Sequence, residues 1–132
     1  MENLKKRFII EENLGEKKIE GYVERLLQFC KVTTNGEILI TADKLTTLEK
    51  VKIALVARFL ANKLDANISA EMTHEELSTL LEIPRNQIRA RLKDVRATKF
   101  GFDSGNGLYK VKPLTIGKFL DELESKYGVD KK

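Results

Sequence analysis

Apolar residues return every three or four positions in five segments of the chain, which is the spacing of an amphipathic α-helix. The predicted helices cover residues 19–30, 46–64, 73–81, 84–98 and 115–127. The second of them carries apolar side chains on nearly all faces, so we expect it to be the central helix. Residues 1–18 are mostly charged and predict a loosely attached arm or short strand. The polar connection 65–72 has room for one further short strand.

Polar residues at the segment boundaries indicate where these helices begin. Thr46 and Glu49 fit a capping box, in which the hydroxyl accepts a backbone N–H bond and the carboxylate returns one. Thr73 and Glu76 fit the same pattern. Pro84 suits the first turn of a helix, and it disfavours the helical conformation for the residue before it. A break between two short helices is therefore predicted just before Pro84.

Two β-hairpins are predicted between the helices. In the first, Asn35-Gly36 separates the β-branched runs 31–34 and 37–41, and we expect both turn residues to take positive φ. The second hairpin covers residues 99–112, with the turn-rich segment 103–107 at its tip. The resulting fold class is mainly α with small β-hairpins, an α+β arrangement.

The composition describes one soluble globular domain of 132 residues and 15.1 kDa. A single cysteine, Cys30, and a single histidine, His74, exclude an internal disulfide and a zinc site, and we expect no metal and no cofactor. We interpret Cys30 as a small core residue of its helix and His74 as an exposed bystander. The longest apolar run, residues 53–57, is far shorter than the ~20 residues of a membrane span. No secretory segment is present at the start, so we expect a cytoplasmic protein without a membrane partner.

Positive charge is concentrated in one part of the chain. Between residues 84 and 112 there are eight basic side chains and two acidic ones, a net charge of +6. The whole chain carries +4, so the remaining residues sum to −2. Such an asymmetry is the electrostatic footprint of a nucleic-acid-binding surface. A third of the residues are charged and only two are glutamine, a balance often met in thermophile proteins.

The segment EELSTLLEIPRNQIRARLKDV, residues 75–95, resembles a helix-turn-helix core. The following KFGFDSGNGLYKVKP, residues 99–113, resembles a wing. The order of elements is similar to the winged helix-turn-helix family of DNA-binding proteins, in particular prokaryotic and archaeal transcription regulators. The resemblance implies a winged helix-turn-helix domain over 46–113, preceded by an extension of arm, helix and hairpin (1–45) and followed by a C-terminal helix (114–132).

Two positions depart from the pattern of that family. The turn residue that is usually a left-handed glycine is Glu82, which implies strain of about 1 kcal/mol or a different turn. The tip of the expected wing carries Asp103 and no basic residue. We therefore expect no insertion of the tip into a groove, and at most phosphate contacts from the hairpin lysines.

The resemblance implies that helix 84–98 enters the major groove of double-stranded DNA with its N-terminal residues at the base edges. Ile88, Leu92 and Val95 share one stripe that faces the core, which leaves a basic stripe beside it. Arg side chains can pair with guanine, and Asn or Gln side chains with adenine. The base-reading candidates are Arg85, Asn86, Gln87 and Arg89. The phosphate-binding candidates are Thr73, Lys93, Arg96, Lys99, Lys110 and Lys112.

The first functional hypothesis is a sequence-preferring DNA-binding protein, a transcription regulator acting as a homodimer. Dimerisation is expected because helices 19–30 and 115–127 each carry an apolar stripe, although the two stripes could instead pack on each other. The alternative is a winged-helix module that binds other proteins without specific DNA binding. The sequence contains no phosphate-binding loop, nucleophile elbow or paired-histidine motif, so an enzyme is not expected.

Overall fold

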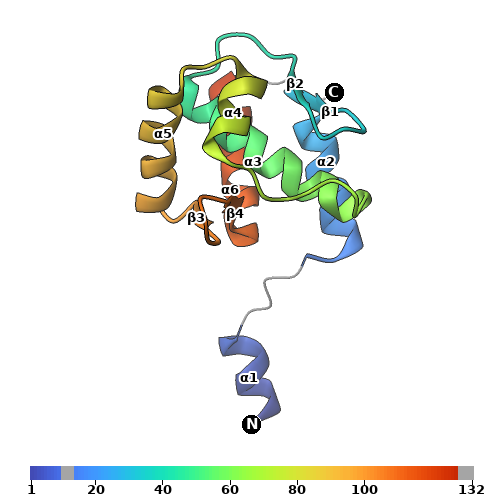
Figure 1. Ribbon diagram of the computed structural model, residues 1–132. Coiled ribbons are helices and arrows are strands. Elements are labelled where there is room, and N and C mark those ends of the chain that lie inside the picture. Colours follow the sequence, from blue (N-terminus) through green and yellow to red (C-terminus); the bar gives the residue numbers. More distant parts are fainter. Residues whose placement is uncertain (10–13, 128–132) are drawn as a thin grey trace.

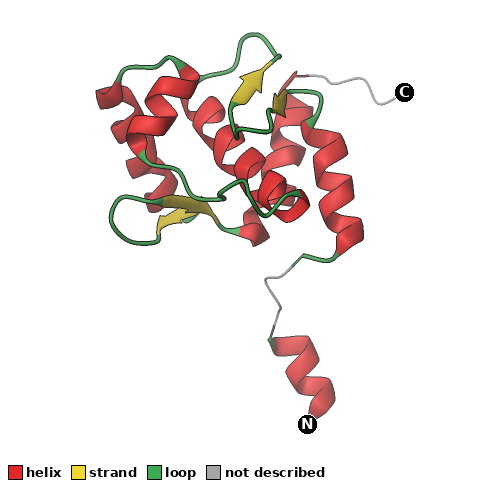
Figure 2. Cartoon of the chain, turned by 45° about the vertical axis from the view of Figure 1, so that its right-hand side comes forward, coloured by secondary structure: helices red, strands yellow, loops and turns green. Residues whose placement is uncertain are grey.

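The computed structural model describes residues 1–9 and 14–127 (Figure 1). Its helices are α1 (Glu2–Phe8), α2 (Glu16–Leu26), α3 (Thr47–Leu64), α4 (His74–Leu81), α5 (Arg85–Ala97), the short 3-10 helix η1 (Pro113–Thr115) and α6 (Ile116–Tyr127). Its strands are β1 (Cys30–Val32), β2 (Ile38–Ile40), β3 (Gly101–Asp103) and β4 (Tyr109–Val111). The protein is mainly helical with two small antiparallel hairpins, which confirms the predicted α+β class (Figure 2).

The central helix of the fold is α3, around which α2, α4, α5 and both hairpins pack (Figure 1). Its apolar side chains are buried on nearly all faces, from Val51 to Leu60. The predicted capping box is present at its start. Thr46 Oγ1 accepts a hydrogen bond from the Glu49 N–H at 3.1 Å, and the Glu49 carboxylate accepts one from the Thr46 N–H at 2.9 Å. Two residues three positions apart therefore provide hydrogen-bond acceptors for backbone N–H groups at the start of this helix.

Arg58 brings a charge into the buried part of α3 and changes the start of α4. Its guanidinium donates to the carbonyls of Gly36 at 2.6 Å and Ser69 at 2.9 Å, and to the carboxylate of Glu76. Thr73 Oγ1 does accept the Glu76 N–H at 3.1 Å, but the returning bond of the second predicted capping box is absent. That half of the prediction is wrong because a guanidinium is a stronger donor to a carboxylate than a neutral backbone N–H is.

A tight turn joins α4 to α5 where the proline predicts a break. Glu82 closes α4 in the left-handed conformation, with φ 57° and ψ 46°, which is the strained turn expected of a residue other than glycine. Pro84 is the residue immediately before α5 and not part of its first turn. Ile88, Leu92 and Val95 are all buried, so the rotation of α5 follows the predicted apolar stripe.

The second hairpin lies against α3 and α5 as a small sheet. A β-carbon at Gly101 would lie 2.7 Å from the carbonyl oxygen of Lys110 and 3.0 Å from Val95 Cγ1, so only glycine allows this approach. The polar connection before α4 contributes one antiparallel bridge, between Met72 and Tyr109, and thereby adds a third short segment beside β4. The order along the chain is α3, the bridge segment, α4, α5 and the hairpin.

Two predictions near the first hairpin are corrected by the structure. The helix predicted over 19–30 is α2, which begins three residues earlier, at Glu16, and ends four residues earlier, at Leu26. Cys30 lies in β1 and not in the helix. Cys30 is nevertheless buried, and burial raises the pKa of its thiol to about 12. In the turn, Gly36 has a φ of 86° whereas Asn35 does not have a positive φ. A three-residue loop ending in a left-handed glycine replaces the predicted two-residue turn.

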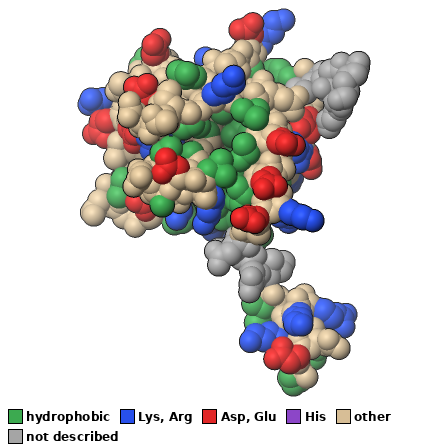
Figure 3. Space-filling view, turned by 90° about the vertical axis from the view of Figure 1, so that its right-hand side faces the viewer, with side chains coloured by type: hydrophobic (Ala, Val, Ile, Leu, Met, Phe, Trp, Pro, Cys, Tyr) green, Lys and Arg blue, Asp and Glu red, His purple; other side chains and the backbone are tan. Residues whose placement is uncertain are grey.

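The predicted N-terminal arm contains the helix α1, and its described residues form no strand. None of the residues of α1 is buried, and the helix stands away from the rest of the protein (Figures 1 and 3). Residues 10–13 of the arm and residues 128–132 of the predicted C-terminal segment lie outside the described residues.

Helices α2 and α6 pack against each other, so their apolar stripes are covered within one chain. Arg25 on α2 also joins them through ion pairs to Asp121 at 2.5 Å and Glu124 at 2.8 Å. The residues that they contribute to the common core are Ile19, Leu26, Ile116, Phe119, Leu120 and Leu123. The expectation that these stripes need a second copy of the chain therefore loses its basis, and the packing of one stripe on the other is observed.

Candidate nucleic-acid interface

Helix α5 lies at the outer edge of the molecule, with one stripe toward the core and the rest of its surface toward solvent (Figure 1). All four base-reading candidates are exposed: Arg85, Asn86, Gln87 and Arg89. Asn86 and Lys93 lie farthest from the core, at about 160° and 140° from Ile88 around the helix axis. Gln87 lies at about 260°, so the rotation of the helix separates it from the arginine side.

Two arginines of α5 contact side chains of neighbouring elements. Arg89 Nη2 donates to Nε2 of His74, on α4, at 3.1 Å. The Arg96 guanidinium lies 6.0 Å from the centre of the Tyr109 ring on β4, a cation–π contact. The expectation of an exposed bystander is wrong for His74, which is partly buried and also lies 3.4 Å from a carboxylate oxygen of Glu75. Because these contacts restrict two long side chains, less rotamer freedom is left to lose when a ligand binds.

The acidic residue of α5 is neutralised within the helix. Arg91 Nε donates to Asp94 Oδ2 at 2.9 Å, a pair of residues three positions apart. Within residues 1–9 and 14–127, no carboxylate pairs with Arg85, Lys93 or Arg96. The exposed face of α5 thus keeps a positive charge that a polyanion such as the phosphate backbone of DNA can neutralise.

Three of the phosphate candidates lie on α5 or shortly after it, and a fourth, Thr73, lies at the start of α4. Lys93 is exposed on the outward face, and Arg96 is exposed one turn farther along the helix. Lys99 follows α5 in the left-handed conformation, with φ 62°, and is exposed. The Thr73 hydroxyl caps α4, next to the histidine that contacts α5. Their role as phosphate contacts stays a prediction.

The other two phosphate candidates belong to a different surface. Lys110 and Lys112 alternate along the chain with the buried Val111 and lie on the face of the hairpin opposite to Tyr109. They line a pocket with Lys63, from the last turn of α3. Strand alternation thus gives Lys110 and Lys112 a surface of their own, and their contact with a phosphate stays a prediction.

The hairpin tip is acidic and tied to the connection before α4. The Asp103 carboxylate accepts a hydrogen bond from the Gly105 N–H at 2.8 Å. The Ser104 hydroxyl donates to the carboxylate of Glu71 at 2.7 Å. These contacts place a further carboxylate beside a tip that has no basic residue. Repulsion from a phosphate backbone would therefore oppose insertion of the tip into a groove.

Three residues that shape this region were not among the sequence candidates. Arg58 interrupts the apolar pattern of α3, a signal for a buried charge, but its partners come from three distant segments. Tyr109 on β4 contacts the Arg96 guanidinium, and this contact depends on where the fold places the hairpin relative to α5. Phe102, on β3, is 37% exposed although it is a large apolar residue. Its position in the second hairpin is predictable, whereas its exposure is not.

No protein-family model, curated protein or solved structure matches this chain. None of the described helices combines the length and apolar character needed to cross a membrane. In the part of the chain that the structure describes, no three metal-ligating side chains come together. The geometry of α5 and of its neighbours is therefore the basis on which a function can be argued.

Proposed function

We propose that this protein is a winged helix-turn-helix DNA-binding protein, a transcription regulator that places α5 in the major groove of duplex DNA. The observation that carries the proposal is the exposed face of α5, where Arg85, Asn86 and Arg89 precede Lys93 and Arg96 and no described carboxylate pairs with Arg85, Lys93 or Arg96. The chain order of α3, a bridge segment, α4, α5 and a hairpin against α5 supports the family assignment. The cytoplasmic location expected from the sequence is part of the same proposal.

The residues of α5 divide into two roles in this proposal. Arg85 and Arg89 each donate two hydrogen bonds to a guanine, and Asn86 pairs with the edge of an adenine. Gln87 reads a base on the opposite flank of the helix. Lys93, Arg96, Lys99 and Thr73 contact phosphates and fix the register of the helix on the duplex.

The test begins with selection of bound duplexes from a random pool, because an enriched motif reports both specificity and half-site spacing. Binding of the selected duplex is then followed by fluorescence anisotropy at increasing salt. The logarithm of the affinity should fall with the logarithm of the salt concentration with a slope near −0.9 per phosphate contact. Absence of salt-dependent binding would contradict the proposal and favour the alternative, a winged-helix module that binds proteins.

Variants separate base reading from phosphate contact. Arg85→Ala and Arg89→Ala should each cost about 1–3 kcal/mol on the selected motif and relax base preference, whereas Lys93→Ala should weaken all duplexes alike. Lys17→Ala is a matched control, since Lys17 is an exposed cation on α2, on another side of the protein. An equal loss from all three α5 variants on every sequence would leave only non-specific binding.

The proposal keeps a homodimer, but its interface differs from the apolar stripes of the two helices that the sequence analysis expected to form it. Exposed leucines lie at the end of α2, on β2 and at the end of α3: Leu27, Leu39 and Leu64. Apolar side chains gather in a hollow on this side of the protein (Figure 3), which α2, β1 and the C-terminal half of α3 line. Sedimentation velocity at tens of micromolar protein tests the assignment. A monomer would imply recognition of a single half-site.

A further inference from the structure

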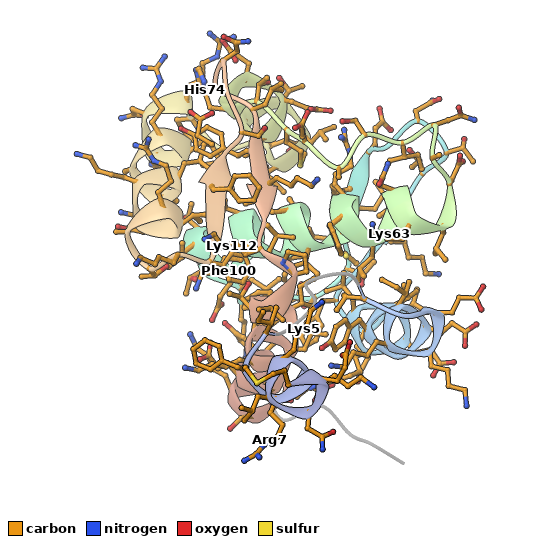
Figure 4. All side chains as sticks on the ribbon, turned by 90° about the horizontal axis from the view of Figure 1, so that it is seen from below. Lys5, Arg7, Lys63, His74, Phe100 and Lys112 are labelled. Atoms are coloured by element: carbon orange, nitrogen blue, oxygen red, sulfur yellow. The ribbon has the colours of Figure 1, made fainter. Side chains whose placement is uncertain are left out.

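The outer face of the second hairpin carries a basic pocket with aromatic walls, separate from the exposed face of α5. It is formed between the C-terminal half of α3 and the two strands of the hairpin. Its principal side chains are Phe59, Lys63, Phe102, Lys110, Lys112 and Pro113. None of the residues that line it is acidic. Figure 4 labels Lys63 on α3 and Lys112 beside the hairpin.

Phe102 is the unusual residue of this pocket. It sits directly across the hairpin from Lys110, so the two side chains share one face of the sheet. Phe102 leaves 37% of its surface exposed, and the hydrophobic core of the described residues does not include it. Phe59 is buried behind the pocket, with Lys63 Nζ 5.2 Å from its ring centre. The pocket therefore combines one partly exposed aromatic ring with three lysine side chains.

The three ammonium groups of the pocket have no carboxylate partner among the described residues. A ligand that satisfies this pocket needs a flat apolar face for the ring and negative charge for the lysines. An unpaired nucleotide has both features, because its base can stack on an aromatic ring while its phosphates meet cations. In a duplex the faces of the bases are already stacked on one another, so an intact duplex cannot use Phe102 in this way.

We propose that this pocket binds single-stranded nucleic acid, with one base stacked on Phe102 and the flanking phosphates contacted by Lys63, Lys110 and Lys112. The contact goes beyond the proposed reading of a duplex by α5, and the two surfaces can be tested independently. The protein would then recognise unpaired strands through the hairpin and paired strands through α5.

The test uses the full chain and two fluorescein-labelled 12-nucleotide strands, oligo-dT and oligo-U, in anisotropy titrations at low salt. Phe102→Ala should weaken binding about tenfold through loss of the stacked base. Phe102→Tyr should retain affinity close to the natural protein, because a ring is preserved. Phe8→Ala is the matched control, since Phe8 is an exposed phenylalanine on α1. Lys63→Ala and Lys112→Ala should each reduce the salt slope by about 0.7.

The lack of tryptophan in the natural sequence allows a second, direct measurement. Phe102→Trp places one indole in the pocket, and its emission should be quenched when a base of oligo-dT or oligo-U stacks on it. Quenching by either strand supports the proposal, and the strand that binds more tightly identifies the natural class of ligand. Absence of quenching together with an affinity of Phe102→Ala within twofold of the natural protein would overturn it.

A duplex control keeps this proposal separate from the proposed function. Arg85→Ala and Arg89→Ala should weaken binding to the blunt selected duplex and leave binding to oligo-dT unchanged. Phe102→Ala should do the reverse. If no duplex is bound but oligo-dT binding depends on Phe102, the α5 proposal fails and the pocket proposal stands. If duplex binding is intact and neither strand binds at tens of micromolar protein, the pocket proposal fails.

Discussion

The exposed face of α5 and the body formed by α2, α3 and α6 both contain arginines, but the two regions use these charges differently. In the body, Arg25 forms ion pairs with Asp121 and Glu124, and hydrogen bonding to Glu124 holds the pKa of Arg25 above its usual value. Arg58 is buried, and its guanidinium donates to three carbonyls and a carboxylate. On α5, by contrast, Arg85 has no described carboxylate partner.

This difference separates charges that hold the fold together from charges that are available to a ligand. A buried cation must be paired, because desolvation without a partner costs several kcal/mol. An exposed cation has no such requirement, so the lack of a carboxylate beside Arg85 costs little stability and leaves it open to an anion. The net charge of a region therefore does not tell whether its cations stabilise the fold or are available to a ligand. The presence or absence of a carboxylate partner for each cation does.

The largest expected effect is that of Arg58→Ala. Removing the guanidinium leaves the carboxylate of Glu76 and the carbonyls of Gly36 and Ser69 without their donor. The free energy of unfolding should fall by about 3–5 kcal/mol, measured by urea denaturation. Arg85→Ala serves as the control and should change it by less than about 0.5 kcal/mol. Equal losses from the two variants would remove the distinction between the two regions.

The contact of the hairpin with α5 is tested by Gly101→Ala. The added β-carbon would meet the Lys110 carbonyl and Val95, and should lower the free energy of unfolding by about 1–3 kcal/mol. Gly21→Ala on α2 is the comparison, because nothing lies within 4 Å of its position. It should raise stability by about 0.5–1 kcal/mol through higher helix propensity. In thermal unfolding, the midpoint temperature should fall for Gly101→Ala and rise for Gly21→Ala. An unchanged midpoint for Gly101→Ala would mean that β3 does not lie this close to β4 and α5.

Arg25→Ala tests whether the paired arginine on α2 serves stability alone. Its side chain is 30% exposed, so solvent screening limits the loss of unfolding free energy to about 1 kcal/mol. The affinity for the selected duplex should not change. Arg89→Ala should show the converse pattern, with lower duplex affinity and nearly unchanged stability. A loss of duplex affinity in Arg25→Ala would show that the two regions are not independent.

The smallest expected effect is a dependence of stability on pH through Glu49. Partial burial opposes ionisation of Glu49, but hydrogen bonds from Lys126, Tyr127 and the Thr46 N–H outweigh it and lower its pKa below the ordinary value of 4.5. The stabilisation is therefore present above about pH 4.5 and is lost as the pH falls through the lower value of the folded state. Glu49→Gln should flatten the acid side of the stability curve in urea titrations. An unchanged acid limb would contradict this assignment.

Much of the architecture was predictable because it depends on residues close together in the sequence. The apolar stripe Ile88, Leu92 and Val95 is buried as its helical spacing predicts. The Thr46 capping box forms between residues three positions apart. The end of α4 at Glu82 follows from the proline that comes two residues later. The exposure of the base-reading candidates follows from the same helical rotation.

Other features depended on partners that lie far apart in the chain. Local pattern assigned the Glu76 carboxylate to a capping box, whereas tertiary packing brings it to Arg58, 18 residues away. The continuous apolar spacing placed Cys30 in a helix, but pairing with Ile40 makes it part of a strand. The apolar stripes of α2 and α6 suggested a second copy of the chain, and instead they meet across more than ninety intervening residues, as the Arg25–Asp121 pair shows.

By itself, the sequence determined the positions of α3, α4, α5 and α6, the capping box at Thr46, the side of α5 that faces the core and the concentration of positive charge between residues 84 and 112. These properties arise from periodicity and from contacts within one helical turn. Only the tertiary structure decided that Arg89 meets His74 and that Lys110 and Lys112 join Lys63 and Phe102 in a separate pocket. Those contacts require elements to be placed in space, and the burial of a common core sets that placement.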